Sequence, residues 1–307
     1  MNKIYNTKVR VMHNDNKSVS AIGLGCVTFG REIDQDTSFE MMNYAASAGI
    51  TLFDTSPSYG EGVSEEIVGS WLSRQPLNCH KISVSTKIQP PFDPSNILDS
   101  VDQSLRRLKM NKIDIVFLHR WDAAVETLAT LKSLDDLRKS GKVGMLGASN
   151  FSIDQLETII GLQKKHGFHT LKFLQNNNNL VIRDINPDLE KFCLNNDIKI
   201  ITYSPLGAGF LTGKYKGGVK EGTRFSVIKG HQDIYFNETS FKRLEQLQNL
   251  SFRTGYKPFY LALAWALHRP NIASVLVGGR TTEQLEQAMS ALNFNNADIL
   301  NELELIK

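Results

Sequence analysis

Features that mark membrane, secreted or nucleic-acid-binding proteins are missing from this chain of 307 residues. No apolar run approaches the roughly 18–20 residues that span a bilayer, and the N-terminus lacks the apolar core of a secretory signal. The net charge of +3 is too small to favour nucleic acid or an anionic membrane as a partner. These absences predict a cytoplasmic protein that binds neither nucleic acid nor a membrane.

Cysteine is also scarce. The chain has three, Cys26, Cys79 and Cys193, and no CxxC pair. An odd number without such spacing indicates neither a disulfide framework nor a zinc site. We therefore expect reduced thiols and no metal centre.

Eight short runs of near-continuous apolar character recur along the chain, as parallel strands buried on both faces do. Segments with apolar residues at three- and four-residue spacing lie between them, typical of helices. The runs are AIGLGCV (21–27), ITLFDTS (50–56), KISVSTK (81–87), IDIVFLH (113–119), VGMLGAS (143–149), LKFLQNN (171–177), IKIITYS (198–204) and ASVLVGG (273–279).

Polar residues ahead of the helical segments predict where those helices begin. Asp36 or Thr37 could cap the first helix, and the later helices are preceded by Ser64, Ser95, Thr127 and Ser152. Asn186 is followed by Pro187, which suits the first helical position. Eight strand–helix repeats in a chain of this size predict a single-domain (β/α)8 TIM barrel spanning residues 1–307.

The rival fold is an open, doubly wound sheet. When it binds a dinucleotide, such a fold typically carries a GxGxxG motif after the first strand. The only candidate, Gly23-Leu24-Gly25, has no glycine three residues on and no amphipathic helix behind it. The barrel is therefore the better interpretation.

Two segments fall outside the repeat. The first residues, including VRVM (9–12), could form a short N-terminal hairpin that closes the bottom of the barrel. Residues 213–237 form a long connection after the seventh strand, and such loops are uncommon unless functional or disordered. Their basic side chains could fold over a bound cofactor, or the segment could be a solvated, mobile loop.

An acid, a phenol, an amine and an imidazole follow three consecutive strand-like runs. Asp54, Lys87 and His119 stand at the strand ends, and Tyr59 lies five residues beyond Asp54. Each alone would more often be structural, as a cap, a solvated charge or a core histidine. Because barrel active sites lie at the carboxyl ends of the strands, the four together predict one pocket.

The chemistry that this set suits is proton delivery to a carbonyl oxygen. A free tyrosine has a pKa of about 10, and a Lys87 ammonium beside Tyr59 is expected to lower it. Asp54 would neutralise and orient Lys87, because an unpaired buried ammonium is costly. His119 would hydrogen-bond the carbonyl oxygen. None of these groups supplies two electrons, so a cofactor must carry the hydride.

The order of the motifs resembles that of the aldo-keto reductases, from about Val19 to Leu292. The similar segments are DTSPSYGEGVSEEIVGSWL (54–72), STKI (85–88), FLHRWD (117–122), GKVGMLGASNF (141–151), YSPLGAGFLTGKY (203–215) and VLVGGRTTEQLEQ (275–287). The resemblance implies a barrel that binds NADPH or NADH across its mouth without a Rossmann fold. It makes Tyr59 the general acid, supported by Lys87, Asp54 and His119.

The same resemblance implies a set of cofactor-binding residues. Ser149, Asn150 and Gln175 would bind the nicotinamide carboxamide, and Tyr203 would stack on the ring. Ser204, Leu206 and Gly207 would meet the pyrophosphate, and Gly278, Gly279, Arg280 and Gln284 the adenosine end. A guanidinium at 280 can pair with a 2′-phosphate, which favours NADPH over NADH; otherwise Arg280 would solvate the start of the last helix.

Two departures from the family pattern concern the adenine end. Ala288 stands where the family often has asparagine, and Val277 replaces a common proline, while Gln287 could compensate in part. For the substrate, Val27, Phe29 and Trp121 are expected at the pocket mouth. A small carbonyl compound such as a sugar or an aromatic aldehyde would fit there.

The expected function is NAD(P)H-dependent reduction of an aldehyde or ketone, with Tyr59 as proton donor. Two alternatives stay open. One is an NAD-dependent aldose or alcohol dehydrogenase that uses the same site in reverse. The other is a cofactor-sensing regulatory subunit, like the family's ion-channel partners.

Overall fold

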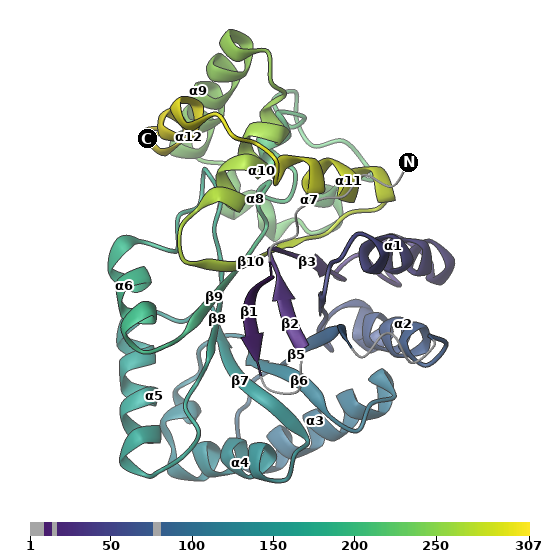
Figure 1. Cartoon of the computed structure of the whole chain (residues 1–307), viewed down its shortest axis with the longest axis vertical. Coiled ribbons are helices and arrows are strands. Elements are labelled where there is room, and N and C mark those ends of the chain that lie inside the picture. Colours follow the sequence, from purple (N-terminus) through teal and green to yellow (C-terminus); the bar gives the residue numbers. More distant parts are fainter. Residues whose placement is uncertain (1–8, 14–16, 76–80) are drawn as a thin grey trace.

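Eight parallel strands close into a barrel in the computed structural model, which describes residues 9–13, 17–75 and 81–307 (Figure 1). The strands follow one another round the barrel in chain order, and the last pairs with the first. The predicted (β/α)8 fold is confirmed, and each apolar run corresponds to one barrel strand, although β5 and β10 each extend one residue beyond their run. The strands are β3 (Ile22–Gly25), β4 (Leu52–Asp54), β5 (Ser83–Ile88), β6 (Ile113–Leu118), β7 (Val143–Ser149), β8 (Phe173–Asn177), β9 (Lys199–Tyr203) and β10 (Ile272–Val277).

Helices surround the barrel, with at least one after each strand (Figure 1). Their buried faces and the outward faces of the strands make the larger apolar core. The helices are α1 (Gln35–Ser47), α2 (Val63–Leu72), α3 (Pro94–Leu108), α4 (Leu128–Lys139), α5 (Ile153–Lys165), α6 (Pro187–Asn195), α7 (Arg224–Val227), α8 (Gly230–Tyr235), α9 (Glu238–Thr254), α10 (Pro258–His268), α11 (Thr282–Ala291) and α12 (Ala297–Glu304), with 3-10 turns η1 (Gly60–Gly62), η3 (Ala123–Glu126) and η4 (Phe210–Thr212).

Three of the predicted helix starts are confirmed. The side chains of Thr127, Ser152 and Asn186 each accept a hydrogen bond from a backbone N–H in the first turn. The starts predicted at Ser64 and Ser95 are wrong, because both serines lie inside their helices, which begin after Gly62 and Asp93. The start predicted for α1 is also wrong. Asp34 caps that helix, accepting from the backbone N–H of Thr37, because it is the acid that stands three residues before a free helical amide.

The N-terminal hairpin is confirmed and closes the end of the barrel where the strands begin. Strand β1 (Val9–His13) pairs antiparallel with β2 (Lys17–Ser20) (Figure 1). Val19 is completely buried in the cluster of apolar side chains that fills the barrel interior. Lys17 Nζ lies 2.8 Å from both oxygens of Asp114, at the start of β6. One end of the barrel is thereby sealed, which leaves the carboxyl ends of the strands for ligands.

The long connection after β9 is folded. Residues 213–237, called the strap from here on, contain α7 and α8. The rings of Tyr215 and Phe225 stack face to face with centres 4.2 Å apart, and Phe225 also stacks on Tyr235 at 5.7 Å. All three side chains are buried. The segment is therefore folded and packed on its own aromatic side chains, and the alternative of a fully solvated loop is wrong.

Candidate active site

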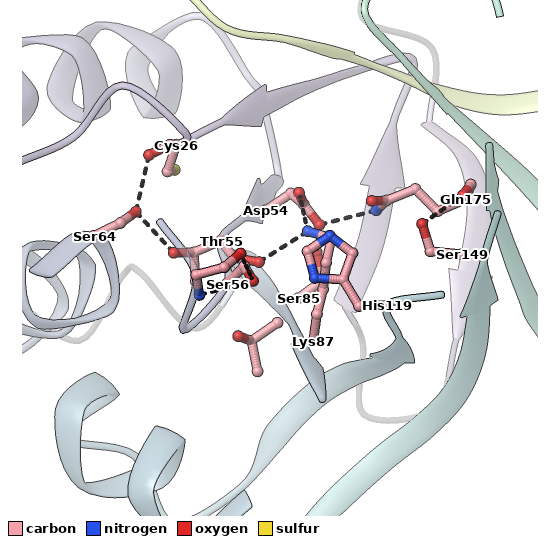
Figure 2. A network of polar contacts seen from close by, with 12 residues as sticks. Cys26, Asp54, Thr55, Ser56, Ser64, Ser85, Lys87, His119, Ser149 and Gln175 are labelled. Atoms are coloured by element: carbon pink, nitrogen blue, oxygen red, sulfur yellow. Dashed lines mark hydrogen bonds and ion pairs between the residues drawn. The ribbon is translucent and has the colours of Figure 1, made fainter. Parts of the chain in front are cut away.

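Side-chain alternation along the strands stacks a polar layer above an apolar layer inside the barrel. Residues two apart on a strand share a face. In β4, Leu52 belongs to the interior apolar cluster and Asp54 lies above it; Phe117 of β6 bears the same relation to His119. The polar layer at the carboxyl ends contains Asp54, Lys87, His119, Ser149 and Gln175 (Figure 2). Tyr203, the last residue of β9, belongs to the same layer.

Asp54 is the centre of a hydrogen-bond network that joins β4, β5 and β8 (Figure 2). Its Oδ1 accepts from Ser85 Oγ at 2.6 Å and from Gln175 Nε2 at 2.9 Å. Its Oδ2 accepts from Lys87 Nζ at 2.7 Å, and the same ammonium donates to the carbonyl oxygen of Thr55 at 2.9 Å. Buried charges are stable only when paired and hydrogen-bonded, so this network fixes the lysine.

Tyr59 lies against Lys87, with Nζ 4.9 Å from the centre of the phenol ring. The turn that follows the tyrosine uses Gly60 and Gly62, whose φ angles are +57° and +95°. A Cβ on Gly62 would also lie only 2.9 Å from Arg107. The positive φ angles favour glycine at both positions, and the turn holds the phenol at the barrel rim.

Burial is the largest influence on the pKa of Tyr59 and raises it above its ordinary value, although the Lys87 charge opposes this. Lys87 thus lowers the pKa of this phenol, as predicted, but burial outweighs it and the pKa lies above its ordinary value. The reason is that burial removes the water that would stabilise a phenolate. Burial is also the largest influence on Lys87 and lowers its pKa, but Asp54 and Tyr59 together raise it above the ordinary value. At neutral pH the site holds a neutral phenol and a charged ammonium.

His119 is neutral in the same pH range. Burial, followed by the charge of Lys87, lowers the pKa of its imidazole to about 4. The side-chain amide nitrogen of Gln89 contacts Nδ1. Because an amide NH₂ can only donate, Nδ1 accepts and the ring proton lies on Nε2. Gln89 was not anticipated from the sequence, yet it stands two residues after Lys87 on the same side of the chain, a signal that could have found it.

Ser149, Asn150 and Tyr203 are brought together where β7 and β9 end. Asn150 has φ +62° and is exposed. Its Nδ2 donates to Ser149 Oγ and to the carbonyl oxygen of His119, both at 3.1 Å, and its Oδ1 accepts from the Tyr203 hydroxyl at 2.7 Å. Ser149 Oγ donates to the carbonyl oxygen of Gln175 at 2.8 Å. These residues form one polar cluster beside His119.

The turn after β9 contains Ser204, Leu206 and Gly207. Ser204 and Gly207 have φ angles of +56° and +57°. A Cβ on Gly207 would lie 3.0 Å from the ring of Tyr235 in the strap. Asn179 Nδ2 donates to the Ser204 carbonyl oxygen at 3.0 Å. The turn is thus held between the strap and the loop that follows β8.

The residues predicted for the adenosine end lie at the start of α11. Gln284 Oε1 accepts from the backbone N–H of Arg280 at 2.8 Å, and the carbonyl oxygen of Gly279 accepts from Thr28 Oγ1 at 2.9 Å. A Cβ on Gly278 would lie 3.2 Å from the carbonyl oxygen of Gly25, so the chain passes close to β3. Ala288 is completely buried, and no polar side-chain atom stands at that position.

The guanidinium of Arg280 does not simply solvate the start of α11. Its Nε and Nη2 lie 2.9 and 2.7 Å from Glu32 Oε2, and Nη1 donates to the carbonyl oxygen of Gly222 at 2.8 Å. Glu32 also pairs with Arg224 of the strap. Glu32 was not predicted, because its partners Arg224 and Arg280 lie 192 and 248 residues away in the chain, outside any local pattern.

Of the three residues expected at the substrate mouth, two have partly exposed side chains. Val27 and Trp121 are half-buried, and the Trp121 ring meets Phe151 edge-on at 5.4 Å. Phe29 was expected beside them, but this is wrong. Its side chain is completely buried in the core between strands and helices.

The fold and the site together define the class. The structure is a closed (β/α)8 barrel with an ion-paired lysine, a phenol and a neutral imidazole at its carboxyl rim. The chain belongs to the aldo/keto reductase family, whose model matches residues 21–300. This family generally uses NAD(P)H and acts on small-molecule carbonyl compounds.

Individual relatives agree with this assignment, and one solved structure shares the fold. The chain is 32% identical to aldo-keto reductase YhdN of Bacillus subtilis, over 87% of this chain and 83% of that one. It is 27% identical to Protein tas of Escherichia coli, over 97% and 96%. The structure of a glycerol dehydrogenase from Gluconobacter oxydans superimposes with a TM-score of 0.80 at 24% identity, covering 98% and 95%, which shows the shared fold. Among the described residues, no helix has the length and apolar character to cross a bilayer.

Proposed function

We propose that this protein is an NADPH-dependent carbonyl reductase, in which Tyr59 gives a proton to the oxygen of an aldehyde or ketone. The observation that carries the proposal is the buried Asp54–Lys87 pair beneath Tyr59, next to a His119 ring that is neutral. A neutral phenol backed by a fixed ammonium is a proton donor whose conjugate base is stabilised as it forms. His119, with its proton on Nε2, donates a hydrogen bond to the same oxygen.

The residues of the rim fit a nicotinamide dinucleotide, which supplies the hydride when bound. Asn150 and Ser149 offer amide and hydroxyl groups that suit a carboxamide. Gln175 offers its side-chain oxygen Oε1, because its Nε2 is bonded to Asp54. Tyr203 presents its ring beside them. Asn150 would exchange its bond from the Tyr203 hydroxyl for one from the ligand.

The remaining groups suit the phosphates and the adenosine end. Ser204, Leu206 and Gly207 lie in a turn of left-handed backbone beneath the strap, which we propose covers the pyrophosphate. Gly278, Gly279, Arg280 and Gln284 would bind the adenosine end, with Arg280 on the 2′-phosphate. These residues and the strap lie on the rim that carries Tyr59, so one extended ligand would reach both.

Replacing Tyr59 by phenylalanine tests the proton donor. A general acid contributes about 10²–10⁴-fold, so we expect kcat for NADPH-dependent reduction to fall roughly 10³-fold, while the dissociation constant of NADPH, measured by fluorescence titration, stays within about twofold. Tyr256→Phe is the matched control, because Tyr256 is exposed and packs on Tyr260 and Phe294. Undiminished turnover in Tyr59→Phe would remove the assignment.

One observation favours a second function. Every nitrogen of the Arg280 guanidinium already has a partner, which weakens the case for a 2′-phosphate there and favours an NAD-dependent aldose or alcohol dehydrogenase on the same site. Titration with both reduced cofactors separates the two, and a clear preference for NADH would establish the second. A panel of aromatic aldehydes, methylglyoxal, free sugars and keto sugars would then define the substrate between Val27 and Trp121.

A further inference from the structure

Glu32 holds three arginines together across the mouth of the barrel. It lies in the loop between β3 and α1, and its side chain is 5% exposed. Oε1 is paired with Arg31 Nη2 at 2.7 Å and with Arg224 of the strap, and Oε2 lies 2.7 Å from Arg280 Nη2. These contacts join the first barrel loop, the strap and the last barrel loop through one carboxylate.

The cluster has an excess of positive charge that a single acid only partly compensates. Burial is the largest influence on the pKa of Glu32 and raises it, but Arg224 and Arg280 together bring it below its usual range, so the carboxylate is ionised. Three guanidinium groups and one carboxylate leave a local charge of two positive units. A ligand group with two negative charges would neutralise these two positive units, but it would compete with the Glu32 carboxylate for the Arg280 guanidinium.

Arg280 is where the two anions would conflict. A guanidinium binds a carboxylate or a phosphate best along one edge, through two parallel hydrogen bonds. The Nε–Nη2 edge of Arg280 faces Glu32, and Nη1 is bonded to Gly222. A phosphate on this side chain has to share or displace those bonds, whereas a ligand without it does not.

We infer that Glu32 determines cofactor choice: its carboxylate competes with the 2′-phosphate for Arg280 and weakens the preference for NADPH over NADH. The inference rests on the proposed binding of a nicotinamide dinucleotide at this rim. It concerns the ratio of two affinities, which is separate from whether carbonyl reduction takes place.

The test is binding of NADPH and NADH to Glu32→Gln, followed by fluorescence without substrate. Glutamine keeps an acceptor for the arginines and removes the competing charge. We expect the affinity for NADPH to rise about tenfold while that for NADH changes less than about twofold. The salt dependence of NADPH binding should also become steeper, because a more positive site now meets the 2′-phosphate.

Two further variants make the result specific. In an Arg280→Met background, Glu32→Gln should change the NADPH-to-NADH ratio less than about twofold, because the shared partner is gone. Glu40→Gln removes the same charge from an exposed position on α1 and should leave the ratio unchanged. Retained NADH binding shows that each variant is folded.

The outcomes separate this inference from the proposed function. If the unaltered protein binds neither dinucleotide, the proposed function fails. If it binds them and Glu32→Gln leaves the ratio unchanged, or lowers the affinity for NADPH, the competition model is overturned. Lowered affinity would mean that Glu32 instead orients Arg280 toward the phosphate.

Discussion

Removing the buried ammonium is the sharpest perturbation of the proposed chemistry. In Lys87→Met the charge that lies 4.9 Å from the Tyr59 ring centre disappears. At an effective dielectric constant of about 20, a unit charge at that distance stabilises a phenolate by roughly 3 kcal/mol. Since about 1.4 kcal/mol corresponds to a factor of ten in rate, we expect the rate of carbonyl reduction to fall about 200-fold.

The assay is single-turnover reduction with NADPH bound beforehand, so that cofactor affinity does not enter the rate. Lys142→Met is the control, because it removes an ammonium from a pair in which both side chains are well exposed. Lys87→Met also leaves Asp54 buried without its partner, which typically costs about 3–5 kcal/mol of stability. Asp54→Asn in the same chain should recover stability but not the rate. A Lys87→Met rate within about threefold of the unaltered protein would refute this account.

Two more predictions concern stability and pH. Glu65 is completely buried and accepts from Arg107 Nε at 2.6 Å, so Arg107→Met should lower the free energy of unfolding, measured by denaturant titration, by about 3 kcal/mol. The control Lys132→Met, which breaks an exposed pair, should change it by less than about 1 kcal/mol. Equal effects of the two substitutions would contradict the burial argument. His119 has a pKa of about 4 in the folded chain against about 6.5 unfolded, so its contribution to stability is unchanged above pH 6.5 and declines as the pH falls toward 4. Turnover should accordingly show no titration of His119 between pH 6 and 8, and a step near pH 6.5 that vanishes in His119→Asn would contradict the neutral assignment.

The barrel was predictable because its signals are local. Each strand is a short apolar run, and the caps at Thr127, Ser152 and Asn186 stand directly before their helices. Where several polar residues cluster, as before α1, the pattern does not say which of them accepts the helical N–H, and Asp34 was missed. The local sequence therefore predicts that a helix is present but does not determine the residue at which it begins.

The sequence predicts which residues come together at the site better than it predicts their pKa values. That Asp54, Lys87 and His119 would meet follows from their places at consecutive strand ends. The direction of the Tyr59 pKa does not, because it depends on how much water reaches the phenol, which only the packed structure gives. The Glu32 cluster depends on contacts between loops far apart in the chain, and nothing within either loop indicates the other.

The stacked aromatic rings of the strap have a thermodynamic consequence. Fixing one backbone residue costs about 1–2 kcal/mol in conformational entropy, so a disordered segment of this length would consume tens of kcal/mol of binding free energy on closing over a ligand. Tyr215, Phe225 and Tyr235 have already removed that freedom during folding. Any opening of the strap must then be a movement of a preformed unit. Gly209 and Gly213, both at positive φ, are the hinge residues nearest the start of the strap.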